Sequence, residues 1–439
     1  MTTVEQARHV CSLGALQSVL AMPRSVPILH AGPGCGQKLW GAVAEANGYQ
    51  GAGYAGGSAV PCSNFTEREV IFGGEDRLRE EIGNALKLMD ADLFAVLTGC
   101  TPDIVGDDVR RVVQEFQKRG APIFWAETGG FHGSNYDGHE RVLLALIEQQ
   151  LAKGGDIEPG LVNIWSIVPY QDTFWEGDIE ALSTLIASLG LRPNTIFGYH
   201  GGPNALARVA RAELNLLVSP WLGLRAMKAL ESRFGTPFLH YPVLPIGPAE
   251  TSRFLRQLGE ATGVDSKKVE EMIDEQERRY FHFVGRSSDI LLEVRMGIPA
   301  RFVTIADSFY APAIARFLAI DFGLRPEQTF IIDRTPPEYQ DAVRSLFAGI
   351  HDDLAEPPVI FTNDGGVIRE TLRNVTFPSR PFVIGSNWDR VLAKEFQGYP
   401  LSVSLPCSDR LVMSRSYVGY EGGLRLAEDL YSVVFSYHQ

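Results

Sequence analysis

The sequence has few of the features that mark membrane, secreted and nucleic-acid-binding proteins. No apolar stretch in its 439 residues approaches the ~18 that a membrane-spanning helix needs. Its 40 basic side chains against 53 acidic ones leave a net charge of −13, which argues against a nucleic-acid or anionic-membrane partner. The N-terminus lacks the basic-then-apolar layout of a signal peptide, and five cysteines are too few for a secreted disulfide scaffold. We therefore expect a cytoplasmic protein whose thiols are reduced or bound to metal.

Apolar residues are plentiful and follow a repeating order. Hydrophobic residues make up 45% of the chain, and at roughly 150 residues per domain its length predicts about three domains. Short apolar runs alternate with turns and helical patterns, which is typical of parallel sheets. The expected strands are residues 27–30, 93–97, 122–126, 162–168, 195–198, 214–219, 237–241, 301–306, 329–332, 359–362, 382–386 and 401–405. We predict an α/β fold of three Rossmann-like domains, 1–155, 156–300 and 301–439, each a parallel sheet flanked by helices.

Helical patterns fill the spaces between these runs. They are expected at residues 13–20, 178–189, 204–212, 222–233 and 249–261. The highly charged stretch 265–279 is predicted to be a solvated helix between the second and third domains. Residues 48–63 consist mostly of small residues without apolar periodicity, and such a long loop inside a compact domain is usually functional or mobile.

Four of the five cysteines lie in the first 100 residues, and three of them occupy informative positions. Cys35 and Cys100 each follow a predicted strand and have glycine neighbours, and ligands bind outside the carboxyl ends of strands in open α/β sheets. Cys11 precedes a helical stretch, whose N-terminal dipole favours a thiolate. No C-x-x-C pair is present, which argues against a zinc ribbon or a thioredoxin-type motif. Three thiolates from three loops suit an iron–sulfur cluster better than a tetrahedral zinc ion.

Two other interpretations of these residues stay open at this point. Isolated cysteines are among the most often buried residue types and usually act as small hydrophobic side chains. The glycine-rich turn at residues 32–36 could instead bind phosphate. That turn lacks the full G-x-G-x-x-G pattern, because Gln37, followed by Lys38, takes the sixth position counted from Gly32.

Short motifs between residues 11 and 422 match one known family in order. They are Cys11-Ser12-Leu13-Gly14-Ala15, His30-Ala31-Gly32-Pro33-Gly34-Cys35, Thr66-Glu67 with Val70-Ile71-Phe72-Gly73-Gly74, Cys100 with Val105-Gly106-Asp107-Asp108, Asp409-Arg410, and Gly419-Tyr420-Glu421-Gly422. Together they resemble the β-type subunit of nitrogenase component 1 and of nitrogenase-like reductases. The resemblance covers nearly the whole chain, and its specificity comes from the set rather than from any single motif.

The resemblance implies a metal site. Cys11, Cys35 and Cys100 match the thiolates that hold half of a P-cluster-type iron–sulfur cluster, which is shared with a homologous α-type subunit. Where some β subunits place a serine near the cluster, this chain has Gly130, so ligation by a serine is in doubt, although Ser134 lies close in sequence. The other two cysteines, Cys62 and Cys407, have no ligand counterpart, and we expect Cys407 to be a buried thiol.

The resemblance also implies partner proteins. Phe72 matches a phenylalanine near the surface where an ATP-dependent iron–sulfur reductase, itself a homodimer, docks; the alternative is that Phe72 packs in the core. The expected assembly is an α2β2 heterotetramer. In the family, a catalytic cofactor is held by the α-type subunit through a cysteine of its middle domain and a histidine of its last. This chain has no cysteine from 101 to 406, and only His351 and His438 in its third domain, so no catalytic residue is expected in it.

Three functions compete within this resemblance. The leading hypothesis is the β subunit of a methylthio-alkane reductase, which relays electrons to a cofactor that cleaves C–S bonds of small methylthio compounds. The alternatives are the β subunit of a true nitrogenase, which reduces dinitrogen, and a non-catalytic subunit of a cofactor-assembly scaffold. Three retained cysteines argue against the scaffold. Two features favour a nitrogenase-like enzyme. The segment before Cys11 is short, and the sequence differs from the nitrogenase motifs at Ala31, Gly130 and Cys407. A protochlorophyllide-type reductase is a further option, although its smaller cluster is held mostly by the other subunit.

Overall fold

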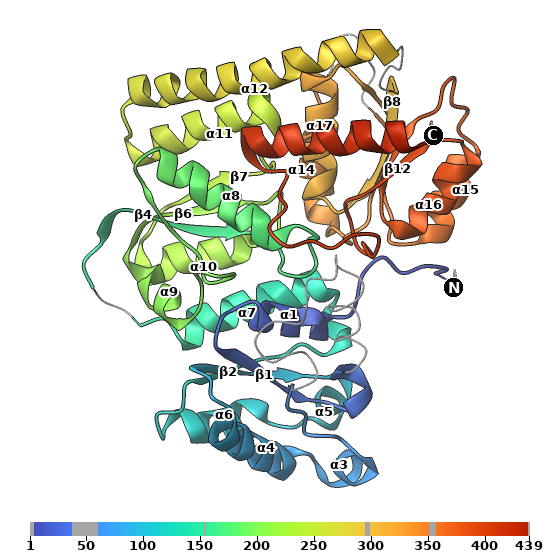
Figure 1. Ribbon diagram of the computed structural model, residues 1–439. Coiled ribbons are helices and arrows are strands. Elements are labelled where there is room, and N and C mark those ends of the chain that lie inside the picture. Colours follow the sequence, from blue (N-terminus) through green and yellow to red (C-terminus); the bar gives the residue numbers. More distant parts are fainter. Residues whose placement is uncertain (1–3, 37–59, 153–154, 295–298, 351–356, 438–439) are drawn as a thin grey trace.

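Three parallel sheets flanked by helices make up the molecule (Figure 1). The computed structural model describes residues 4–36, 60–152, 155–294, 299–350 and 357–437. All strand pairs of the three sheets are parallel, because each connection crosses over through a helix or a long loop. The predicted fold class of three Rossmann-like parallel sheets is confirmed, whereas domain boundaries near residues 155 and 300 stay predictions.

The first sheet has three strands in the order β1-β2-β3 and carries two of the candidate cysteines on its loops. Its strands are β1 (Ser25–His30), β2 (Leu93–Thr98) and β3 (Ile123–Ala126). On one face α4 (Glu75–Leu88) and α6 (Val109–Gln117) bury an apolar cluster, and on the other lie α1 (Leu16–Leu20) and α7 (Asn135–Gln149). Two short helices, α3 (Glu67–Phe72) and α5 (Cys100–Val105), lie at one end of this unit (Figure 1).

The second sheet has the order β5-β4-β6-β7. Its elements are β4 (Glu158–Ser166), α8 (Trp175–Ser188), β5 (Arg192–Asn194), α9 (Pro203–Arg208), β6 (Ala212–Val218), α10 (Leu224–Phe234), β7 (Phe238–Tyr241) and α11 (Gly247–Thr262). Helix α7 of the first unit packs against α10, and the large apolar core runs without interruption through all three units.

The third sheet has the order β10-β9-β8-β11-β12, which is the 3-2-1-4-5 order of a doubly wound fold. Its elements are β8 (Arg301–Ala306), α13 (Tyr310–Arg316), β9 (Arg325–Ile331), α14 (Pro337–Ser345), β10 (Val359–Phe361), α15 (Gly365–Arg373), β11 (Phe382–Gly385), α16 (Arg390–Glu395), β12 (Tyr399–Ser402) and α17 (Gly419–Ser436). Five short helical turns complete the description: η1 (Ser12–Ala15), η2 (Gly130–His132), η3 (Val209–Arg211), η4 (Phe317–Asp321) and η5 (Asn387–Asp389).

One predicted strand is wrong. The strand expected at residues 195–198 lies instead at Arg192–Asn194. This strand is at the edge of its sheet, where the missing N–H of Pro193 leaves no gap in the ladder. The residues that follow form a turn in which the Thr195 hydroxyl accepts from the Phe197 N–H at 3.2 Å. Phe197 is buried against the core without pairing to a strand, so its apolar character was misleading.

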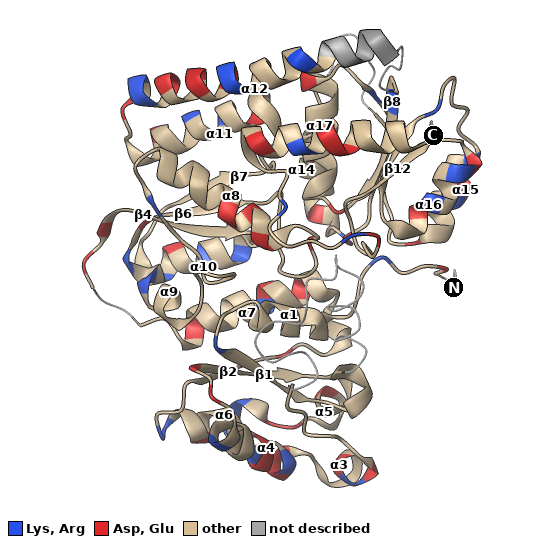
Figure 2. Ribbon diagram, viewed as in Figure 1, with Lys and Arg blue, Asp and Glu red and all other residues tan. Residues whose placement is uncertain are grey.

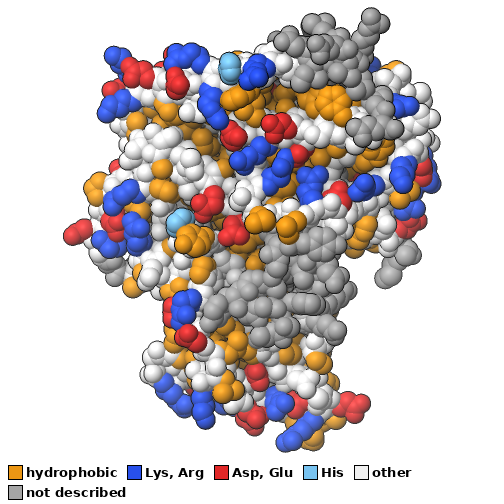
Figure 3. Space-filling view, viewed as in Figure 1, with side chains coloured by type: hydrophobic (Ala, Val, Ile, Leu, Met, Phe, Trp, Pro, Cys, Tyr) orange, Lys and Arg blue, Asp and Glu red, His pale blue; other side chains and the backbone are white. Residues whose placement is uncertain are grey.

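The charged stretch forms a long surface helix, as predicted. Helix α12 (Ser266–Val294) begins one residue after the predicted start and continues well beyond residue 279. In Figure 2, the ribbon of its first part alternates between the colours of basic and acidic residues. A groove of about 600 Å³ lies between α12 and α17, lined by Phe283, Leu424, Tyr431 and Phe435 among others, and Figure 3 shows hydrophobic side chains gathered there. None of the described helices is long and apolar enough to cross a membrane.

The N-terminal segment lies against the third sheet before it reaches the first. Arg8 donates to both carboxylate oxygens of Asp389, at 2.9 and 3.0 Å, and both side chains are almost fully buried. The backbone N–H of Arg8 donates to the carbonyl of Asn363 at 3.1 Å. Residues far apart in the sequence therefore fix the position from which Cys11 enters the first unit.

Candidate functional site

The loops at the carboxyl end of the first sheet bring two predicted cysteines together. Cys100 is the first residue of α5, directly after β2, and Cys11 immediately precedes η1. Both thiols are exposed. Cys11 pairs with Ser134 in an antiparallel bridge, which places the start of the chain beside the segment that follows β3.

Gly130 lies between these two cysteines. Its backbone N–H donates to the sulfur of Cys100 at 3.1 Å. A Cβ atom at this position would lie 3.0 Å from that sulfur and 3.7 Å from the Cβ of Cys11. A side chain at position 130 would therefore press on the Cys100 sulfur and touch Cys11, so glycine keeps side-chain atoms out of the space between the two residues.

Cys35 lies in a helical turn over residues 33–36, in the loop after β1. Strand β1 is the neighbour of β2, and the Gly99 N–H that precedes Cys100 donates to the carbonyl of His30 at 2.8 Å. The loops that carry Cys35 and Cys100 therefore leave the sheet side by side. The side chain of Cys35 is exposed, and among the described residues no atom lies within 4 Å of a Cβ added to Gly32 or Gly34 beside it.

This donor set fits a cluster of several metal atoms better than a single ion. Within the described ranges, no three Cys, His, Asp or Glu side chains come together as ligands of one metal ion. Three exposed thiols on adjacent loops, with a residue that lacks a side chain between two of them, match the chemistry of an iron–sulfur group, whose ligands are cysteine thiolates. The interpretation of all cysteines as buried small side chains is wrong for Cys11, Cys35 and Cys100.

The two remaining cysteines have structural surroundings. Cys62 pairs with Leu29 beside β1, its thiol donates to the carbonyl of Ala31 at 3.2 Å, and partial burial raises its pKa. Cys407 is fully buried, as expected, and burial raises the pKa of its thiol to about 12. A thiol with such a pKa is not a ready metal ligand at neutral pH.

Ser134 has a structural role in the helix that follows it. Its hydroxyl donates to Asp137 at 3.0 Å, and the pair forms the capping box at the start of α7. The residue is 1% exposed. Its hydroxyl is therefore engaged in the protein, while its backbone holds Cys11 in place.

Phe72 lies on the surface and does not pack in the core. It is 82% exposed at the end of α3, a helix without a single buried residue. Ile71 and Val70 of the same helix are also exposed, as is Ile104 on the contacting helix α5. We call Val70, Ile71, Phe72 and Ile104 the α3 patch. Exposed apolar groups gathered in this way are typical of a protein interaction site.

A buried polar network that sequence reasoning missed lies between the α3 patch and the cysteine loops. The imidazole of His30 contacts Ser63 Oγ and Asp107 Oδ2, each at 3.0 Å. Asp107 also accepts from the Gly74 N–H at 2.9 Å. His30 and Asp107 belong to the motifs that carry the family resemblance. The feature of the sequence that could have indicated this network is a histidine at the end of a predicted buried strand.

A search of known families gives a match over residues 11–435, to the model described as nitrogenase component 1 type oxidoreductase. The chain belongs to this family. It is a nitrogenase component 1-type subunit and is similar to beta chains.

Relatives within the family cover almost the whole chain. The nitrogenase molybdenum-iron protein beta chains of Azotobacter vinelandii and Clostridium pasteurianum are each 22% identical over 98% of this chain, and the matches cover 83% and 93% of those chains. The corresponding alpha chain of Methanosarcina barkeri is 25% identical over 62% of this chain and 51% of its own length. A solved structure titled nitrogenase Cp1 at pH 6.5 matches with a TM-score of 0.82 and 19% identity, covering 99% of this chain and 94% of that one.

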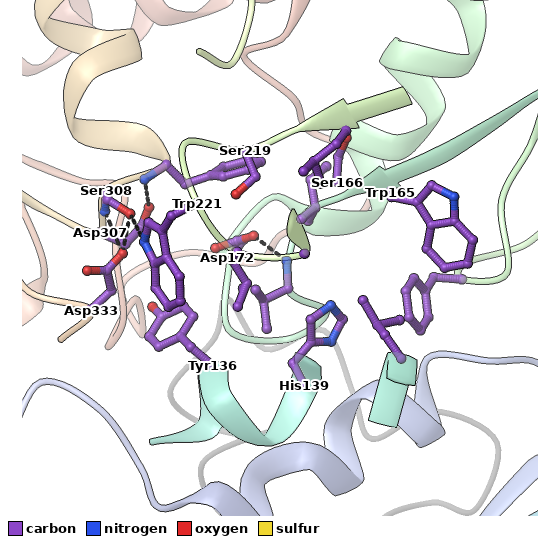
Figure 4. Close-up of a pocket in the computed structure, with 18 residues that line it drawn as sticks. Tyr136, His139, Trp165, Ser166, Asp172, Ser219, Trp221, Asp307, Ser308 and Asp333 are labelled. Atoms are coloured by element: carbon purple, nitrogen blue, oxygen red, sulfur yellow. Dashed lines mark hydrogen bonds between the residues drawn. The ribbon is translucent and has the colours of Figure 1, made fainter. Parts of the chain in front are cut away.

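A second candidate site of this nitrogenase component 1-type subunit is a small cavity where the three units meet. It lies outside the carboxyl ends of β4, β6, β8 and β9, and Figure 4 shows Tyr136, His139 and Trp221 around it. The Trp221 indole donates to Ser308 at 2.8 Å. About 30 Å³ of space is left, which is room for roughly two waters. Aromatic side chains therefore fill the crevice, and no cysteine lines it.

Proposed function

We propose that this chain is the β-type subunit of a nitrogenase-like reductase, that it holds half of a P-cluster-type iron–sulfur cluster, and that it relays electrons to a cofactor in an α-type subunit. The observation that carries the proposal is the meeting of Cys11 and Cys100 at Gly130, beside the loop of Cys35. Three thiols on adjacent loops supply half of a shared ligand set, so the remaining ligands must come from a homologous partner.

In this proposal Cys11, Cys35 and Cys100 hold the cluster. When bound, the cluster would supply one-electron chemistry. The chain's own contribution is to set the surroundings of the sulfur atoms, because hydrogen bonds to sulfur and exclusion of water tune such groups. The Gly130 N–H already donates to the Cys100 sulfur, and the absence of a side chain there leaves the room that a bulky group needs.

The α3 patch is the proposed docking surface of the ATP-dependent iron–sulfur reductase. Its support is the exposure of Phe72 and Ile71, at 82% and 71%, on a helix adjacent to the one that begins at Cys100. Aromatic side chains carry much of the binding energy at the centres of interfaces. Electrons that enter at this patch would reach the cysteine loops across a single short helix, α5.

The catalytic cofactor is proposed to lie in the α-type subunit. Supporting this division, the crevice between the three units of this chain is packed with side chains and leaves about 30 Å³. The proposed assembly is an α2β2 heterotetramer in the cytoplasm, closed by a two-fold axis as most oligomers are.

Reductive cleavage of C–S bonds in small methylthio-alkanes is the proposed reaction of the complex. Gly130, in place of the serine of some β subunits, supports a nitrogenase-like enzyme over a true nitrogenase. The test supplies the anaerobically purified complex with its reductase, ATP and an electron donor, and assays 2-methylthioethanol, dimethyl sulfide, dinitrogen and protons.

Turnover of the methylthio compounds supports the proposal. Ammonia as the main product would instead make the chain a nitrogenase β subunit, and no turnover of any substrate would indicate an assembly scaffold. Activity of the isolated chain with its reductase would contradict the proposed division between the two subunits.

A further inference from the structure

Helix α5 is held at both ends by a single residue of β1. The His30 carbonyl accepts from the Gly99 N–H at 2.8 Å, directly before Cys100 at the start of the helix. The His30 imidazole contacts Asp107 at 3.0 Å, just past the end of the helix. His30 is itself the last residue of β1, and its loop continues to Cys35. One residue therefore holds α5 at both ends, through its backbone carbonyl before Cys100 and through its side chain beyond Val105.

The direction of the hydrogen bonds in this network follows from its chemistry. A carboxylate only accepts, so the Nε2–H of His30 donates to Asp107. In the neutral imidazole Nδ1 is then the acceptor, and it receives the hydroxyl proton of Ser63 at 3.0 Å, while the oxygen of Ser63 accepts from the Ala31 N–H at 3.2 Å. Both ring nitrogens are satisfied, and the imidazole is fully buried. The ring can therefore neither rotate nor shift without losing a bond.

Asp107 connects the same network to the α3 patch. Its two carboxylate oxygens accept from the Gly74 N–H at 2.9 and 3.0 Å, and Gly74 lies two residues after Phe72. Gly74 also precedes α4, so the N-terminal dipole of that 14-residue helix stabilises the buried carboxylate. A Cβ atom at Gly74 would lie 2.8 Å from Asp107 and 2.4 Å from Phe65, so the contact is tight.

We propose that His30 and Asp107 are positioning residues that couple the α3 patch mechanically to the loops of Cys35 and Cys100. Pressure on the patch, as when a protein docks on it, moves Gly74 and Asp107, and the His30–Asp107 bond passes that movement to both ends of α5. That the α3 patch is a docking surface and that the cysteine loops hold a cluster rests on the proposed function. The contacts through His30 and Asp107 that join the patch to the loops belong to this chain alone. The competing explanation is a buried histidine that only stabilises the first unit.

Amide hydrogen exchange in the full chain measures the link directly. We expect His30→Leu to speed exchange in residues 99–106 and at Gly74 on the order of tenfold, because the buried Asp107 carboxylate loses the His30 donor and keeps only the Gly74 N–H. His30→Gln, whose amide donates to Asp107 and whose carbonyl accepts from Ser63, should restore most of the protection. His139→Leu is the matched control, since His139 is also buried and bonded to a serine, Ser18, at 2.7 Å, but has no contact with Asp107.

A substitution at Gly74, beside the α3 patch, tests whether movement passes from the patch to the cysteine loops. Gly74→Ala forces a methyl group against Asp107 and Phe65 and should change exchange in residues 31–36 and 99–106 severalfold. Gly83→Ala within α4 is the control, because no atom of the described residues outside the helix's own nearby backbone lies within 4 Å of its added Cβ. In the His30→Leu background, the Gly74→Ala effect on these residues should fall by at least half, which is the coupling that a double-mutant cycle isolates.

Two results would overturn the link. One is equal exchange of residues 99–106 in His30→Leu and His139→Leu, and the other is an undiminished Gly74→Ala effect without His30. Should His30→Leu fail to fold, the cycle is run with Gly74→Ala and Asp107→Asn, because an amide offers one acceptor oxygen where the carboxylate offers two. An undiminished Gly74→Ala effect on residues 99–106 in that background counts against the proposal. Iron analysis of the wild-type complex is a separate readout, so a missing cluster would sink the proposed function without touching this result.

Discussion

The buried pair of Arg8 and Asp389 gives a sharp prediction, because it anchors the segment that delivers Cys11. Both side chains are at most 2% exposed, and Arg8 also donates to Ser386 Oγ at 2.9 Å. Arg8→Met keeps the length and apolar stem of the side chain but leaves the Asp389 carboxylate buried without its cation.

Breaking a buried pair in this way costs about 3–5 kcal/mol. The N-terminal segment can also open locally and let water reach Asp389, which makes the loss in global stability somewhat smaller. We therefore expect urea denaturation to show a drop of about 2–4 kcal/mol in the free energy of unfolding. Hydrogen exchange should show lost protection at Ser12, whose N–H donates to the Gly133 carbonyl at 3.1 Å.

Two further variants test whether the loss of stability in Arg8→Met comes from the unpaired buried charge of Asp389. Arg24→Met, at an exposed pair with Asp90 and Asp92, should change stability much less. The double variant Arg8→Met with Asp389→Leu should lose less than the sum of the two single variants, because no unpaired charge stays buried. Equal losses in Arg8→Met and Arg24→Met would refute the reasoning.

Three other predictions follow from exposure and burial. Phe72→Ala should weaken reductase binding at least tenfold with an unchanged melting temperature. The control Tyr199→Ala, at a residue that is 81% exposed, should change neither quantity. A large fall in the melting temperature of Phe72→Ala would contradict its surface role. Burial raises the pKa of Asp178 to about 7, above about 3.9 in the unfolded chain, so the free energy of unfolding should fall as pH rises from about 4 to 7. Asp178→Asn should flatten that slope in urea titrations, and an unchanged slope would exclude this group as its source. In the metal-free native chain, iodoacetamide should label Cys100 readily and Cys407 only after unfolding, and equal labelling rates would contradict their environments.

Local patterns were sufficient to predict most of the fold. Residues 301–306 coincide with β8, and the glycine-flanked cysteines were placed correctly after β1 and β2. Such elements are visible because a buried parallel strand is a short apolar run bounded by turn residues. The edge strand β5 was missed because its residues pair on one side only and need not be apolar.

Contacts between distant residues were beyond this kind of reasoning. The His30–Asp107 bond joins residues 77 positions apart, and Arg8 reaches Asp389 across nearly the whole chain. The backbone contact of Gly130 with Cys100 likewise depends on how two loops approach each other. The family resemblance pointed to His30, Asp107, Cys100 and Gly130 but not to Arg8 or Asp389, and only the three-dimensional arrangement shows which of these residues meet.

The central claim is that Cys11, Cys35 and Cys100 hold an iron–sulfur cluster, and metal analysis of cysteine variants tests it most directly. The complex is purified anaerobically as wild type, Cys35→Ala, Cys100→Ala and Cys407→Ala, and iron and acid-labile sulfide are measured per complex. We predict that the first two variants lose most of the iron assigned to this site, and that Cys407→Ala keeps the wild-type content, because Cys407 is buried away from the loops of the first sheet. Equal iron and sulfide in all four preparations would contradict the assignment.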